Sequence, residues 1–197
     1  MKPKINSLLA LVIAGITPTL ANAESLEFTA KLSGAQEVVF DSGGNFIPGG
    51  TNTSATGKAH VDFEKFLAKV VVNVRIEGLV GTFAAAHFHC GRAGTNGPVA
   101  FGLVNPGPLS FDGEGIRGSL DNTNYTGADC VPVVGRPVNN IAALALAMQD
   151  GLIYINVHSS AFPAGEIRGQ MLEHDGDKDF PGKGKGLDKD KSNKHDD

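Results

Sequence analysis

The chain has no tryptophan, and aromatic residues make up only 7% of its 197 positions. Glycine is abundant instead, with 26 residues, a balance that is typical of short strands joined by many turns. Positive charge is also scarce, because 17 Lys and Arg face 21 Asp and Glu, for a formal net charge of −4. A general nucleic-acid-binding protein normally carries a basic face, so we exclude that class.

Long hydrophobic runs are missing too. The apolar run Leu8–Ile16 is too short for an ordinary membrane span, so we predict none. Lys2 and Lys4 precede this run and Ala21-Asn22-Ala23 follows it, which is the pattern of a secretory signal. We therefore expect a signal peptide over residues 1–23 and a secreted or periplasmic mature protein.

The C-terminal segment, residues 174–197, interleaves Lys and Asp with Gly and has few apolar residues. Such a composition cannot bury enough surface to fold, which predicts a disordered tail after a single domain over residues 24–173. Its spaced aspartates also allow weak calcium binding, although Asp175–Asp179 is too short for an EF-hand loop.

Cysteine is nearly absent, with only Cys90 and Cys130. An even count in an exported chain predicts a disulfide between them, which would stabilise the fold by roughly 4 kcal/mol. The alternative is Cys90 as a thiolate metal ligand beside His89. If the strand continues, however, Cys90 points to the opposite face.

Alternating apolar and polar residues predict an all-β fold, an antiparallel β-sandwich or Greek-key barrel of about eight strands with one short helix. The predicted strands are 26–32, 55–63, 68–77, the strand around 86–90, 99–103, 115–120, 152–158 and 165–172. The helix spans Asn140–Asp150, with Asn139 or Asn140 as its cap and Gly151 at its end.

Three histidines lie where strand geometry could bring them together. His87 and His89 share one face of a strand, with Cβ atoms roughly 6.5–7 Å apart, a spacing that allows both imidazoles to bind one ion. His158 shares a face with Tyr154 and Asn156 on a late strand. We predict that the three meet on a β-scaffold and bind a transition metal; the alternative is that they are ordinary polar residues of a sheet.

The expected metal is copper, with zinc as the second choice, because imidazole suits both ions and copper(II) binds most tightly among the common divalent ions. Three nitrogen ligands leave an open position for water or a small ligand such as superoxide. Candidates for hydrogen-bonding the outer histidine nitrogens are Glu37, Asn156 and Glu166. Arg168 is the candidate catalytic residue, attracting the anion; Glu166 and Arg168 could equally form a surface ion pair.

Several motifs together resemble the chordin-type (CHRD) domain family. They are Gly34–Val38, Ala55-Thr56-Gly57, His87-Phe88-His89 with Gly94–Val99, and Tyr154–Gln170. This resemblance implies an extracellular β-sandwich without one agreed activity. The arrangement of His87, His89, His158, the two cysteines and Gly165–Arg168 is more loosely similar to copper–zinc superoxide dismutase.

These observations support two alternative functions that belong to different classes. The first is an exported copper-binding protein with an open three-histidine mononuclear site, which in its enzymatic version disproportionates superoxide. The alternative is a metal-free extracellular adhesion or ligand-binding module.

Overall fold

The computed structural model describes residues 25–174. The predicted signal peptide, and all of the predicted tail except His174, lie outside the described residues. Within the described part of the chain, no helix is long and apolar enough to cross a membrane.

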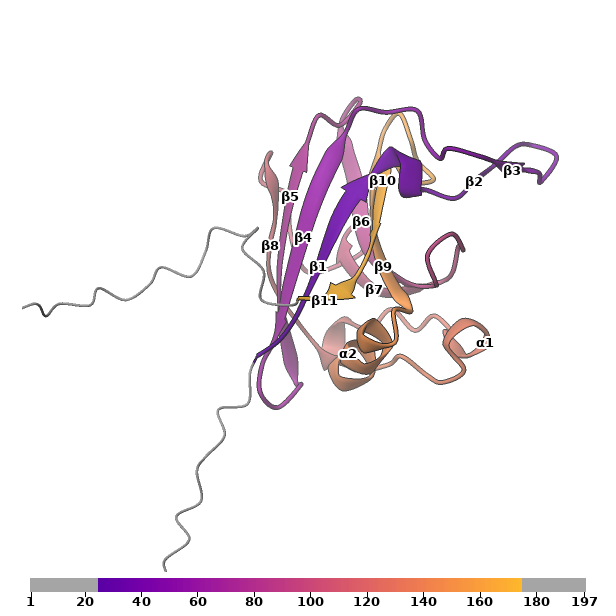
Figure 1. Cartoon of the computed structure of the whole chain (residues 1–197). Coiled ribbons are helices and arrows are strands. Elements are labelled where there is room, and N and C mark those ends of the chain that lie inside the picture. Colours follow the sequence, from indigo (N-terminus) through magenta and orange to yellow (C-terminus); the bar gives the residue numbers. More distant parts are fainter. Residues whose placement is uncertain (1–24, 175–197) are drawn as a thin grey trace, which may run out of the picture.

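The fold is a nearly closed antiparallel barrel, which confirms the all-β prediction (Figure 1). Hydrogen-bonded neighbours run in the order β7-β6-β9-β10-β1-β4-β5-β8, and the short β11 also pairs with β1. The strands of this sheet are β1 (Leu26–Ser33), β4 (Thr56–Phe63), β5 (Lys69–Glu77), β6 (Phe83–Cys90), β7 (Val99–Val104), β8 (Gly115–Asp121), β9 (Ile153–Ser159), β10 (Ile167–Gln170) and β11 (Leu172–Glu173).

One face of every long strand points into a common hydrophobic core. In β4 the inward residues are Ala59, Val61 and Phe63, as their alternation with polar residues predicts, and none is more than 2% exposed. Phe63 packs edge-on against Phe28 of β1, with ring centroids 5.8 Å apart. Since the side-chain period of a strand is two, this inward set fixes which residues face outward.

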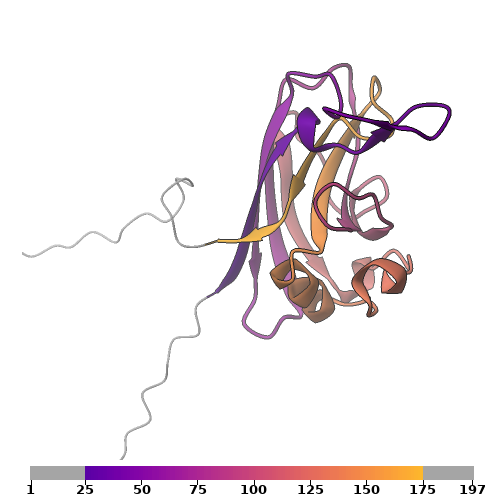
Figure 2. The ribbon, with the colours of Figure 1, turned by 45° about the vertical axis from the view of Figure 1, so that its right-hand side comes forward.

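The predicted helix is confirmed as α2 (Ile141–Gln149), at one end of the barrel (Figures 1 and 2). Asn140 caps it, because its side-chain oxygen accepts a hydrogen bond from the Ala143 N–H at 2.8 Å. Gly151, with φ of 66°, follows the helix end in the left-handed region. A short helix, α1 (Val131–Val134), and two 3₁₀ turns, η1 (Gly34–Gln36) and η2 (Asn122–Asn124), complete the helical elements of the described chain.

A small hairpin lies between the predicted strands 26–32 and 55–63, where the sequence analysis predicts no strand. Its strands β2 (Val39–Phe40) and β3 (Phe46–Ile47) project beyond the barrel at the end opposite α2 (Figure 1). Phe40 and Phe46 pack across it with centroids 6.1 Å apart, and both are about half exposed. Two-residue strands among glycines give no periodic signal, so composition alone could not reveal them.

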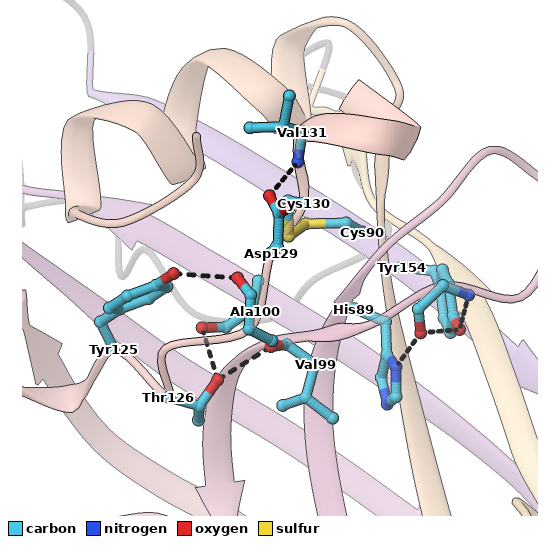
Figure 3. Close-up of a disulfide and its surroundings, with 12 residues drawn as sticks. His89, Cys90, Val99, Ala100, Tyr125, Thr126, Asp129, Cys130, Val131 and Tyr154 are labelled. Atoms are coloured by element: carbon cyan, nitrogen blue, oxygen red, sulfur yellow. Dashed lines mark hydrogen bonds between the residues drawn. A yellow bond between two sulfur atoms is a disulfide. The ribbon is translucent and has the colours of Figure 1, made fainter. Parts of the chain in front are cut away.

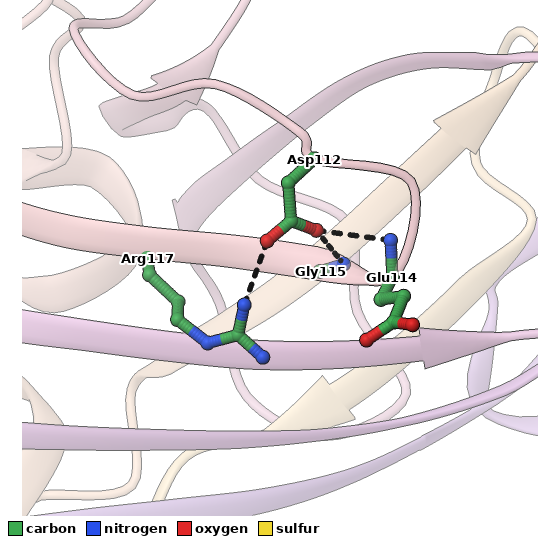
Figure 4. Close-up of polar contacts among 4 residues, drawn as sticks. All are labelled: Asp112, Glu114, Gly115 and Arg117. Atoms are coloured by element: carbon green, nitrogen blue, oxygen red, sulfur yellow. Dashed lines mark hydrogen bonds and ion pairs between the residues drawn. The ribbon is translucent and has the colours of Figure 1, made fainter.

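Figure 4 shows the turn that leads into β8, which is the last strand in the order of the sheet. Asp112 organises it, because one carboxylate oxygen accepts hydrogen bonds from the backbone N–H groups of Glu114 and Gly115, at 2.9 and 2.8 Å. The other oxygen pairs with Arg117 at 2.6 Å. These hydrogen bonds hold the pKa of Asp112 below its usual value.

Candidate metal centre

The register between β6 and β9 places the predicted site residues side by side. His89 lies opposite Tyr154, His87 opposite Asn156, and Ala85 opposite His158. Phe88 and Ile155, the opposed residues between these pairs, point into the core. The histidines therefore share the outer face of β6 and β9, on the side away from the core.

The structure brings the three histidines together. Nδ1 of His87 lies 3.2 Å from Nε2 of His158, and one nitrogen from each of the three rings lies within 4.8 Å of the others. Around a metal with bonds of 2.0–2.1 Å, ligand nitrogens are about 3.3–3.5 Å apart. One pair already has nearly this spacing, and small ring rotations would bring in His89.

The second nitrogen of each imidazole meets a backbone carbonyl. His89 Nδ1 lies 2.8 Å from the Gly97 oxygen, His158 Nδ1 2.9 Å from that of Pro163, and His87 Nε2 3.3 Å from that of Asn105. A carbonyl only accepts hydrogen bonds, so the neutral rings of His89 and His158 carry their protons on Nδ1. His87 has two options, because it can donate from Nε2 to Asn105 or from Nδ1 to His158 Nε2 at 3.2 Å. When His87 donates from Nε2, the three remaining nitrogens are acceptors that face one another.

Burial makes protonation of the three facing histidine nitrogens unfavourable. It is the main cause that lowers the pKa of all three rings, that of His89 to about 4. His89 Nε2 is buried without any hydrogen-bond partner. A buried acceptor without a donor is costly, so the arrangement suits a bound cation that all three nitrogens can share.

The loop of residues 91–98 follows His89. The Cys90–Cys130 disulfide holds its start (Figure 3), and close packing of Gly97 on Cys90 holds its end. Gly97 must be glycine, because a Cβ there would collide with the Cys90 carbonyl oxygen, and this close approach lets the Gly97 carbonyl reach His89. Cys90 points to the core side and is bonded to Cys130, with Cα atoms 5.8 Å apart. The predicted disulfide is confirmed, and Cys90 is therefore no thiolate ligand.

Arg168 lies behind Tyr154 rather than beside the histidine nitrogens. The Tyr154 ring stacks on His89 at 4.9 Å between centroids, and the guanidinium carbon of Arg168 lies 3.3 Å from the Tyr154 centroid. Arg168 is 1% exposed and donates hydrogen bonds to the carbonyls of Arg92 and Thr95, at 3.0 and 2.8 Å. It therefore fixes the loop over the site, and the catalytic role expected for it stays a prediction.

The side chains expected around the histidines make their hydrogen bonds elsewhere. Asn156 interacts with Glu37, and burial raises the pKa of Glu37 to about 7 although Arg168 and Asn156 both oppose the rise. Glu166 is fully buried and accepts hydrogen bonds from the Thr53 hydroxyl at 2.7 Å and the Val80 N–H at 2.9 Å. The outer nitrogens of the histidines are instead held by main-chain carbonyls, which no side-chain pattern could reveal.

Glu37 and His89 should give the metal-free protein opposite pH dependences of stability. Between pH 4.5 and 6.5 native Glu37 holds a proton that the unfolded chain lacks, so its contribution falls as the pH rises toward 7. Native His89 lacks a proton that the unfolded chain binds, so its contribution is full above pH 6.5 and lost toward pH 4. Each slope approaches about 1.4 kcal/mol per pH unit.

Urea unfolding with a chelator present, from pH 4.5 to 7.5, measures these slopes. Glu37→Gln should make stability rise more steeply with pH than in the parent, and His89→Gln should make it rise less. Parallel stability curves for the parent and both variants would contradict the assignment.

Comparison with known proteins agrees with the motifs in the sequence. The family model of the CHRD domain matches residues 28–171, which span the barrel and all three histidines. No curated protein and no solved structure gives a significant match to the chain.

Proposed function

Since the chain belongs to the CHRD domain family, whose domains are found in extracellular proteins, we propose that it is an exported copper-binding protein. Its binding centre would consist of His87, His89 and His158, with copper as the first choice and zinc as the second. The confirmed disulfide agrees with export, because such bonds persist in oxidising compartments.

The facing acceptors of His87 and His158 carry this proposal. His87 Nδ1 and His158 Nε2 lie 3.2 Å apart, and in the tautomer in which both rings donate to carbonyls from their other nitrogen, both are acceptors that one cation could engage. Burial disfavours a proton in that position, whereas a metal ion would also engage the unpartnered Nε2 of His89. Three neutral imidazoles are a good ligand set for copper or zinc.

The same residues allow an enzymatic version of the proposal. Three ligands leave a coordination position open, where copper would supply one-electron chemistry such as the disproportionation of superoxide. The chain itself would hold the rings in place through the carbonyls of Gly97, Asn105 and Pro163. Arg168 would contribute positive charge from behind Tyr154.

Metal analysis of protein purified without a histidine tag tests the binding function. After reconstitution and desalting, we expect about one equivalent of copper per chain, as a single three-nitrogen site requires. Loss of nearly all copper on desalting, with zinc equally absent, would overturn the proposal and favour a metal-free adhesion or ligand-binding module.

A superoxide assay separates binding from catalysis once copper has been found. The copper-loaded parent should consume superoxide faster than His87→Ala treated in the same way. Equal rates would remove the enzymatic version and leave copper binding in place.

A further inference from the structure

The candidate centre has no anionic group among its ligands. Among residues 25–174, which the structure describes, the group of ligand atoms within 4.8 Å of one another contains only the three histidines. Cys90, the nearest cysteine in sequence, is in a disulfide and belongs to the core. A cation bound here would therefore keep its full charge, because neutral imidazoles do not offset it.

The surroundings of the ligands are neutral as well. Each outer nitrogen meets a backbone carbonyl, where many metal-binding histidines donate to a carboxylate that adds negative charge and raises ligand basicity. This arrangement orients the rings without supplying any compensating charge.

Nearby charged side chains do not supply it either. Arg168, a cation, is separated from His89 only by the Tyr154 ring. Burial raises the pKa of Glu37 to about 7, so Glu37 is only partly ionised at neutral pH and its charge interacts with Arg168. Glu166 accepts hydrogen bonds from the Thr53 hydroxyl and the Val80 N–H. Neither acidic residue belongs to the group of ligand atoms, and the charge that the Tyr154 ring separates from His89 is positive.

We infer that the three-histidine centre selects monovalent copper, Cu(I), over divalent ions. This inference rests on the proposed copper-binding function. The cost of transferring an ion from water into a partly buried site rises with the square of its charge, so an uncompensated site penalises a dication far more than a monocation. The protein would then hold or hand on Cu(I) in the exported compartment.

Zinc(II) is a suitable reference ion, because Zn²⁺ and Cu(I) are both d¹⁰ and have no geometric preference from their d-electrons. Their dissociation constants on the full mature chain can be measured by competition with chelators specific for each ion, with Cu(I) kept reduced without oxygen. We expect Cu(I) to bind more tightly than both Zn²⁺ and Cu²⁺.

Asn105→Asp tests whether charge is the cause. Asn105 is exposed, and its backbone carbonyl lies 3.3 Å from His87 Nε2, so the variant adds one negative charge at the edge of the site. It also loses the hydrogen bond that the Asn105 amide donates to the Ala84 carbonyl, which is why the ratio of two ions on the same variant is compared. At low salt the ratio of the Zn²⁺ to the Cu(I) dissociation constant should fall about 5-fold. Asn73→Asp is the matched control, because exposed Asn73 lies on β5, away from β6 and β9, and should leave the ratio unchanged.

The outcomes separate this inference from the function on which it rests. Tighter Cu(I) binding, with a lower ratio in Asn105→Asp but not in Asn73→Asp, supports it. Zn²⁺ or Cu²⁺ bound as tightly as Cu(I), or equal ratios in the two variants, would overturn the selectivity while leaving the copper centre. A parent that binds copper in neither oxidation state would overturn the proposed function itself.

Discussion

Replacing His158 by alanine should lower the affinity for copper by about 100-fold or more. His158 lies on β9, and its Nε2 lies 3.2 Å from His87 Nδ1, so the variant removes the ligand that the barrel brings from a distant part of the chain. Altering a mere hydrogen-bond partner of a ligand typically costs 10- to 100-fold in affinity, and losing a ligand should cost at least as much as the upper value. The remaining pair, His87 and His89, comes from a single strand.

Competition with a copper chelator measures this effect, and far-UV circular dichroism checks that the variant is folded. His60→Ala is a matched control, because His60 lies on β4 and pairs with Glu27 rather than with the three-histidine group. Similar affinities for His158→Ala and the parent would mean that the histidines do not share one ion.

Removing the disulfide should produce the largest loss of stability. Cys90 and Cys130 are separated by 40 positions. Opening a loop of that length is expected to lower the free energy of unfolding by about 4 kcal/mol, mainly because the unfolded chain gains conformational entropy. Both sulfurs belong to the hydrophobic core, so the double variant Cys90→Ala/Cys130→Ala also loses some packing.

This variant should weaken copper binding as well, since Cys90 directly follows His89 and precedes the loop that carries Gly97. Urea unfolding of the parent and the double variant gives the stability difference, and the chelator competition gives the affinity. The parent treated with a reductant, with thiols counted afterwards, provides a control without substitutions. A stability difference below about 1 kcal/mol would contradict the expected contribution of the crosslink.

The sequence by itself determined the long strands of the barrel, the helix α2 and the facing of His87 and His89. One face of a strand is buried, so apolar and polar residues alternate along it, as with the buried Ala59, Val61 and Phe63. This alternation can be recognised in the sequence alone. The helix over 141–149 followed from strong helix formers between a cap and a glycine. The pairing of Cys90 with Cys130 followed because no other cysteine exists.

Only the tertiary structure decided what surrounds the histidines. The carbonyls of Gly97, Asn105 and Pro163 come from loops whose paths depend on the nearly closed barrel. Every residue has a backbone carbonyl, so the residue type does not reveal which one will contact a histidine. The sequence left Arg168 as a candidate catalytic residue or as half of a surface ion pair with Glu166. The structure buries both side chains, which rules out the surface pair, and Arg168 fixes a loop. The face of a strand on which a residue lies follows from the local alternation of side chains. The charge around a site instead depends on every element that packs against it.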